Sequence, residues 1–128
     1  MKKLTLLFLL FILFSGKLLL AQKKDKGDNL KPYFFVLLKK GPYRDQDSIT
    51  AENIQKGHIE NINKLAASGK LIVAGPFIDD GELKGIFIFD SGNEEEVKNF
   101  VDNDPAVKSG RLIYEIHPWM TQKGTCFK

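Results

Sequence analysis

Residues 71–90, LIVAGPFIDDGELKGIFIFD, decide the fold of this chain. Leu71–Ala74 and Gly85–Asp90 are short runs dominated by branched and aromatic side chains, which is typical of β-strands. Asp79–Gly81 lies between them and supplies the residues of a turn. The segment therefore predicts an antiparallel β-hairpin. Gly75–Pro76, at the end of the first strand, indicates either a bulge or a close approach of neighbouring backbones.

Helices are predicted on both sides of this hairpin. Before it, apolar residues recur at helical spacing from about Thr50 to Ser68, and Gly69 is of the residue type that most often ends a helix. After it, a helix is expected from Glu94 to about Asp102, because the three glutamates at its start suit the positive end of a helix dipole.

Two more strands complete the pattern, at Tyr33–Lys39 and Arg111–His117. The order β-α-β-β-α-β predicts an α+β, ferredoxin-like domain, with an antiparallel sheet and its helices on one face. In Tyr33–Leu38 and Ile86–Phe89, however, apolar side chains point to both faces. A sheet that is apolar on both faces must be covered on both. Because the helices cover one face, we expect a homodimer in which the other packs against a partner copy.

The N-terminal residues have the composition of a signal peptide. Lys2 and Lys3 precede a predominantly apolar run from Leu4 to Phe14, which is too short to span a bilayer. We expect cleavage after Ala21 and an exported protein, periplasmic or secreted, with an uncleaved membrane anchor as the alternative. The predicted organisation is a signal peptide at 1–21, a charged linker at 22–32, a folded domain at 33–119 and a polar tail at 120–128.

Charge and cysteine content argue against several functional classes. Lys2, Lys3 and Lys17 account for the whole formal charge of +3, so the remaining chain is neutral and offers no basic surface for nucleic acid. Cys126 is the only cysteine, which rules out an internal disulfide and favours a free surface thiol. The two histidines are accompanied by no cluster of cysteines, so we expect no metal and no cofactor.

His58 is the first candidate for chemistry. It lies on the apolar stripe of the first predicted helix, one turn from Ile54 and one turn from Ile62. An imidazole at such a position needs a hydrogen-bond partner. From periodicity alone, a core histidine bonded to a backbone carbonyl is the simpler interpretation, and a functional histidine is the alternative.

Asp104 is the second candidate. Pro105 follows it and suits the first position of a helical turn, so Asp104 is predicted to cap a short helix that ends at Gly110. A carboxylate has two oxygens, so a capping aspartate can also face His58, since both helices of this topology lie on the same sheet face. His117, beside a proline and a tryptophan, is interpreted as a surface or dimer-contact residue.

Four segments, in this order and spacing, resemble the YCII-related (YciI-like) domain family over about residues 33–119: GHIENINKLAASGKLIVAGPF, DDGELKGIFIF, NDPAVKSG and EIHPW. The resemblance implies a ferredoxin-like fold of the dimeric α/β-barrel group. It also implies an active site centred on a histidine and an aspartate, matched here by His58 and by Asp104 of the Asp-Pro motif. One relative is a dehydrochlorinase of a chlorinated hydroxyhydroquinone, which implies acid–base chemistry on small cyclic substrates.

The resulting hypothesis is an enzyme in which Asp104 orients His58, and His58 is a general acid or base on a small molecule. The walls of its pocket are expected to include Phe35, Gly75, Pro76 and Phe77, with Phe87 as a further aromatic candidate. Two alternatives remain open. The same pocket would serve a non-catalytic module that binds a small ligand, or the histidine–aspartate pair would only hold together a structural dimer.

Overall fold

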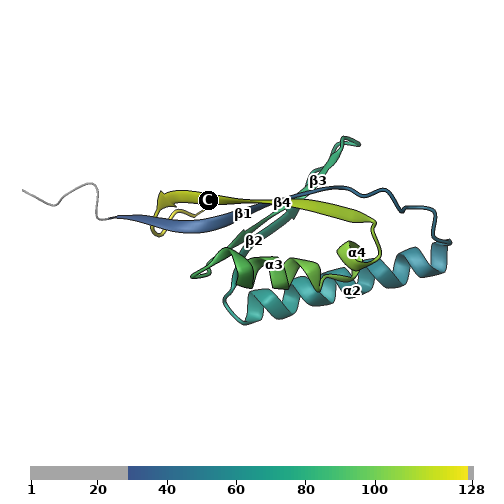
Figure 1. Ribbon diagram of the computed structural model, residues 1–128, viewed down its shortest axis with the longest axis horizontal. Helices are drawn as coiled ribbons and strands as arrows, with labels where there is room; N and C mark the ends of the chain where they lie inside the picture. Colours follow the sequence, from purple (N-terminus) through teal and green to yellow (C-terminus); the bar gives the residue numbers. More distant parts are fainter. Residues whose placement is uncertain (1–28, 127–128) are drawn as a thin grey trace, which may run out of the picture.

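The computed structural model of the protein describes residues 29–126, which form one sheet with all the described helices on one face (Figure 1). The four strands lie in the order β2-β3-β1-β4, and each neighbouring pair is antiparallel. This architecture confirms the predicted ferredoxin-like fold. The elements are β1 (Leu30–Lys40), α2 (Ser48–Ala67), β2 (Leu71–Pro76), β3 (Leu83–Phe89), α3 (Glu94–Asp102), α4 (Pro105–Lys108) and β4 (Leu112–Gln122).

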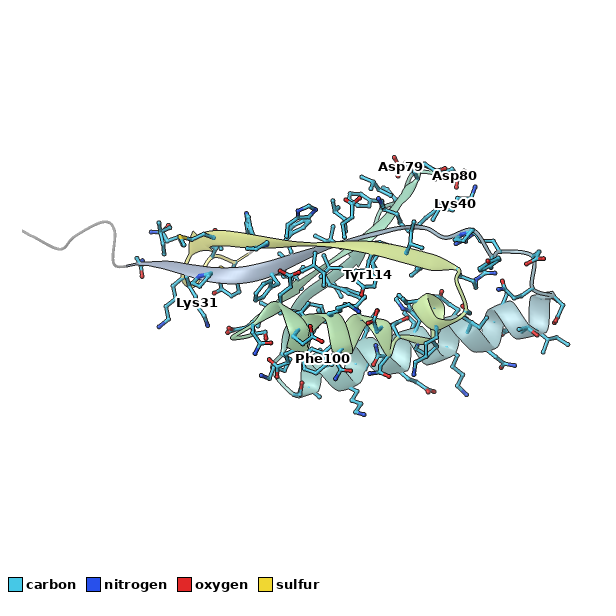
Figure 2. The ribbon with its side chains drawn as sticks, in the orientation of Figure 1. Lys31, Lys40, Asp79, Asp80, Phe100 and Tyr114 are labelled. Atoms are coloured by element: carbon cyan, nitrogen blue, oxygen red, sulfur yellow. The ribbon has the colours of Figure 1, made fainter. Side chains whose placement is uncertain are left out.

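The core lies between the sheet and the helices. Val36 and Leu38 of β1 and Phe87 and Phe89 of β3 point to the helix face, where they are buried. Burial of each such side chain contributes about 1.5–3 kcal/mol to folding. From the helices, the buried partners are Leu65, Val97 and Val101. At the edge of this layer, the hydroxyl of Tyr114 donates to Oδ1 of Asp102 at 2.6 Å, which ties β4 to α3 (Figure 2).

The strands β1 and β4 are longer than predicted. Their pairing runs from Lys40↔Leu112 to Leu30↔Gln122, so it includes residues 30–32 of the predicted linker and residues 120–122 of the predicted tail. The paired strands therefore extend beyond the boundaries predicted at 33 and 119. Backbone hydrogen bonds of the ladder hold this extension, which projects past the helices in Figure 1, and Lys31 adds an ion pair with Asp90. Polar residues take part in such a ladder as readily as apolar ones.

The β2–β3 hairpin forms as predicted, but its irregularity lies elsewhere. The register shifts between Leu71 and Val73, whereas Gly75 and Pro76 stay paired with β3. A bulge at Gly75–Pro76 is therefore wrong, and the alternative, a close backbone approach, is what the structure has. A Cβ atom at Gly85 would lie 2.7 Å from the carbonyl oxygen of Gly75. Pro76 is tolerated because β2 is an edge strand.

None of the helices in the described part of the chain lies on the second face of the sheet (Figure 1). Residues that pair across strands share a face, so Phe35 and Leu37 of β1 lie there with Ile86 and Ile88 of β3. On β4 the same face carries Ile113 and Trp119, which are 44% and 38% exposed. This predominantly apolar face, which we call the open face, consists of Tyr33, Phe35, Leu37, Lys39, Val73, Ile86, Ile88, Ile113, Glu115, His117 and Trp119.

The predicted signal peptide, 1–21, and the first part of the predicted linker lie outside the described residues. Between residues 29 and 126, no helix has the length and apolar character needed to cross a membrane.

Candidate functional site

His58 lies on the face of α2 that packs against the sheet and α4. Its relative exposure is 9%, and its ring stacks on Phe87 with the centroids 6.0 Å apart. The residue before it explains how α4 comes so close. A Cβ atom at Gly57 would lie 3.1 Å from Cγ of Pro105, so the missing side chain lets Pro105 pack directly on α2. Glycine costs about 1 kcal/mol within a helix, and here the close approach accounts for it.

Asp104 is fully buried, with 0% of its surface exposed, and each of its carboxylate oxygens is bonded. Its Oδ1 accepts from the backbone N–H of Ala106 at 2.9 Å, which is the predicted helix cap. Nδ1 of His58 lies 2.8 Å from Oδ1 and 2.9 Å from Oδ2. Nδ2 of Asn61 donates to Oδ2 at 2.9 Å. The structure therefore brings together the two residues that the sequence singled out, and it adds a third.

The hydrogen bonds around Asp104 decide its charge. Desolvation by burial is the largest single influence and raises the pKa of the carboxyl, but the bonds from His58, Asn61 and the Ala106 backbone together outweigh it. The pKa of Asp104 consequently lies below its ordinary value of 3.8. The group is a carboxylate at neutral pH and can only accept hydrogen bonds.

An acceptor-only partner fixes the tautomer of His58. Since Asp104 cannot donate, Nδ1 of His58 must carry the proton that the carboxylate accepts. In the neutral imidazole, Nε2 then holds the free lone pair. Among residues 29–126, no side chain or backbone group is bonded to Nε2, and His58 lines a cavity. The arrangement is that of a general base whose orientation is held from behind by a buried carboxylate.

The cavity has a volume of about 360 Å³, which suits a molecule of roughly one ring. It lies between the sheet and the helices α2 and α4. Its lining residues are Leu38, Arg44, Gln55, His58, Ile59, Ile62, Ala74, Gly75, Pro76, Lys84, Gly85, Phe87, Ala106, Arg111 and Leu112.

Of the residues predicted for the pocket walls, Gly75, Pro76 and Phe87 line this cavity, but Phe35 and Phe77 do not. Phe35 belongs to the open face, where its ring meets the edge of Trp119 at a centroid distance of 5.9 Å. Phe77 lies beyond the end of β2 and is 42% exposed. Both assignments are corrected: Phe35 lies within a strand that is apolar on both faces, so its residue type did not reveal its face, and Phe77 lies beyond the end of its strand, where alternation no longer applies.

The remaining candidates lie away from the cavity. His117 is on the open face, with its Nε2 3.7 Å from Oε2 of Glu115, and Cys126 is exposed. No group of three potential metal ligands occurs in the described part of the chain.

Five polar residues of the site were not predicted, among them Gln55 of α2, which lines the cavity. Asn61 lies three positions after His58, a spacing that puts both on one side of a helix and that offered a usable signal. Arg44, Lys84 and Arg111 also line the cavity. Arg44 lies in the segment between β1 and α2, and Arg111 in the turn before β4, so no periodic pattern indicated where their side chains would point.

Comparison with solved structures finds the same fold in enzymes. The chain is similar to 5-chloro-2-hydroxyhydroquinone dehydrochlorinase from Burkholderia phenoliruptrix AC1100, solved in complex with 2,5-dihydroxybenzoquinone. The identity is 24%, over 68% of this chain and 92% of that one, with a TM-score of 0.52. It is also similar to muconolactone isomerase, at 14% identity over 75% of this chain and 96% of that one, with a TM-score of 0.58. At these identities the likeness is one of fold.

A search of curated protein sequences finds no match. The family comparison, in contrast, matches residues 33–120 to the model of the YCII-related domain. This match spans all the strands and helices described above except the paired outer ends of β1 and β4. It contains His58, Asp104 and every residue that lines the cavity. The chain belongs to the YCII-related domain family.

Proposed function

We propose that this domain is an enzyme that moves a proton on a small molecule, with His58 as the general base and acid and Asp104 as its positioning residue. One observation carries the proposal. A buried carboxylate holds Nδ1 of His58, so that the lone pair of Nε2 is directed to a cavity of about 360 Å³. A positioned acid–base group of this kind contributes roughly 10²–10⁴-fold to a rate.

The chemistry follows from the two states of the imidazole. Nε2 takes a proton from a carbon next to a carbonyl, and the electron pair of the C–H bond moves to the carbonyl oxygen. Asp104 stabilises the resulting imidazolium through Nδ1–H. The proton then returns to another atom, which is an isomerisation, or a leaving group departs, which is an elimination. A dehydrochlorinase and an isomerase share this fold, which supports these two reaction types.

The test is proton exchange into small enolisable molecules in heavy water, followed by NMR. 5-Chloro-2-hydroxyhydroquinone and muconolactone are the first substrates to offer, because the two structural relatives are named for them. We expect the wild-type protein to accelerate exchange or turnover, and His58→Gln to lower the rate by about 10²–10⁴-fold without unfolding the domain. If His58→Gln is as active as the wild type, the histidine is not the catalytic base.

The same variant addresses the alternatives. A binding module would bind the molecules without exchanging their protons, and His58→Gln would only weaken that binding. A purely structural pair would leave both binding and exchange unchanged, and only His58→Ala, which removes the hydrogen bond to Asp104, would lower the melting temperature. The glutamine side chain can still donate to Asp104, so a loss of rate with an unchanged melting temperature favours catalysis over structure.

We also propose that two copies pack through the open face. The support is the absence of any described helix on that face, together with the exposure of Ile113 and Trp119. A contiguous apolar face of this kind is uncommon on a monomer. The polar residues on the face already interact with each other, since Glu115 pairs with Lys39 and lies near His117. Covering the face would therefore leave none of these charges without a partner. We propose further that the protein acts outside the cytoplasm, on the composition of residues 1–21.

A further inference from the structure

The cavity in front of His58 is lined by one sign of charge. Arg44, Lys84 and Arg111 line it together with His58, and no carboxylate from residues 29–126 does so. Asp104 lies behind the histidine and is enclosed by its own hydrogen-bond donors. The β2–β3 turn carries Asp79, Asp80 and Glu82, none of which lines the cavity, and Asp79 and Asp80 are at the tip of the hairpin, on the side of the sheet away from the helices (Figure 2). A ligand in the cavity therefore meets a positive potential.

The two arginines are held in place without being neutralised. Nη1 of Arg44 donates to the backbone carbonyl of Arg111 at 2.8 Å, and Nη1 of Arg111 donates to Oε1 of Gln46 at 2.6 Å. Both acceptors are uncharged, and within residues 29–126 neither arginine forms an ion pair. Elsewhere on the domain, in contrast, Lys31, Lys70 and Lys98 each pair with a carboxylate. The site thus keeps two oriented, uncompensated guanidinium groups.

From this we infer that the cavity takes a small organic anion, whose ionised carboxylate, phenolate or enolate oxygen pairs with Arg44 and Arg111 while its acidic carbon faces Nε2 of His58. The inference deepens the proposed function and rests on it for the role of His58. Guanidinium groups suit this task because they are always charged and present their donors in a planar fork that matches oxygen anions.

The charge balance of the reaction gives the arginines a second use. When Nε2 takes a proton from the carbon of an anion, the imidazole becomes a cation and the substrate gains one further negative charge on oxygen. Oriented cations near that oxygen stabilise the additional charge without having to reorganise. Lys84, which lines the cavity from β3, adds to the potential.

The test uses a matched pair of unreactive probes, 4-hydroxybenzoate and 4-hydroxybenzamide, which have nearly the same shape and differ in charge. Binding to the purified protein is followed by NMR titration. We expect the carboxylate to bind about tenfold or more tightly than the amide, which is the usual size of a hydrogen bond to a charged group. Arg111→Gln and Arg44→Gln should each weaken the binding of 4-hydroxybenzoate by a similar factor and leave the binding of 4-hydroxybenzamide nearly unchanged.

Lys108→Gln is the matched control, because it removes one positive charge close in sequence to Arg111 from a residue that does not line the cavity. It should change the affinity for 4-hydroxybenzoate by less than about twofold, since exposed charges are screened by salt. Arg111→Lys keeps the charge but loses the planar guanidinium group. Its affinity for 4-hydroxybenzoate should lie between those of Arg111→Gln and the wild type. Thermal melting of each variant checks that the fold is intact. Arg44 is an exposed loop residue, so Arg44→Gln is the variant that should disturb the fold least.

The outcomes separate this inference from the proposed function. If the arginine variants lose the carboxylate while His58→Gln retains it, the anion site is supported, whether or not proton exchange is ever detected. If the amide binds as well as the carboxylate, if the arginine variants bind both probes as the wild type does, or if the carboxylate shows no saturable binding in the millimolar range, the inference is overturned. Exchange that depends on His58 would then still support the proposed function.

Discussion

Asp104→Asn tests how much the buried carboxylate contributes. The asparagine has nearly the same shape, and its Oδ1 can still cap α4 through the N–H of Ala106, because asparagine and aspartate are equally good caps. Its amide nitrogen, however, now faces two donors, Nδ1–H of His58 and Nδ2 of Asn61. Both neighbours can relieve the conflict, the histidine by moving its proton to Nε2 and Asn61 by turning its side-chain oxygen towards the new amide, but the hydrogen bonds that result are between neutral groups.

The expected magnitude follows from these contacts. Hydrogen bonds to a charged group contribute about 1.5–3 kcal/mol each, and the variant also avoids the cost of burying a charge, which offsets part of the loss. We therefore expect the free energy of unfolding to fall by about 1–3 kcal/mol, because hydrogen bonds to a charge are replaced by weaker ones between neutral groups, which contribute about 0.5–1.5 kcal/mol each. Catalysis should fall further than stability does, because Nε2 would carry a proton and could no longer accept one.

The assay is urea unfolding of both proteins at equal concentration, repeated at decreasing pH. The pKa of Asp104 in the folded protein lies below 3.8, so the stability that its charge supplies is complete above about pH 4 and is lost as the pH falls through that folded-state pKa. The difference between wild type and variant should therefore shrink as the pH falls below about 4. Asp80→Asn, the same change at an exposed turn residue, should alter stability by less than about 0.5 kcal/mol.

Equal stability of Asp104→Asn and the wild type at neutral pH would refute this reasoning. So would a stability difference that does not shrink in acid, because the buried group would then not be a stabilising carboxylate.

Three further predictions concern the rest of the domain. Leu37→Asp places a charge in the middle of the open face, and we expect it to convert a dimer into a monomer in sedimentation or light scattering, whereas a wild-type monomer at micromolar concentration would overturn the proposed assembly. Gly85→Ala puts a Cβ atom 2.7 Å from the carbonyl oxygen of Gly75, so the hairpin must shift, and thermal melting should report a loss of about 1–3 kcal/mol; an unchanged melting temperature would contradict the close approach. When the full chain is expressed and exported, mass spectrometry should find a protein that begins at Gln22. A mass that includes residues 1–21 would indicate that the segment is not cleaved.

The fold was largely predictable because hydrophobic patterning carries most of it. The hairpin at 71–90, the two long helices and the two-sided apolar strands all follow from residue types and their period. The outer ends of β1 and β4 did not follow, since Leu30–Pro32 and Met120–Gln122 pair through their backbones and have no distinctive alternation.

The site was predictable only where local sequence and family resemblance both pointed to it. His58 lies on an apolar stripe and Asp104 precedes a proline, so each stood out, and their contact followed from the topology. Arg44 and Arg111 lie together because two segments far apart in the sequence pack against each other. The segment after β1 packs on the turn before β4, where the N–H of Gly41 donates to the carbonyl of Arg111 at 2.9 Å. Nothing periodic in the sequence records such a contact.

Phe35 shows the limit of face assignment in a two-sided strand. Both faces of β1 are apolar, so alternation separates Phe35 from Val36 without saying which of the two meets the helices. Only the packing of Val36 and Leu38 against α2 and α3 settles it.

The tautomer of His58 tests the central claim most directly. His117→Gln leaves a single histidine, and nitrogen-15 chemical shifts in mildly alkaline solution, where an imidazole is neutral, show which ring nitrogen carries the proton. The Asp104 contact predicts that Nδ1 is protonated and Nε2 is free, and that Asp104→Asn moves the proton to Nε2. A wild-type histidine that carries its proton on Nε2, or that ignores the change at Asp104, would contradict the acid–base account of this site.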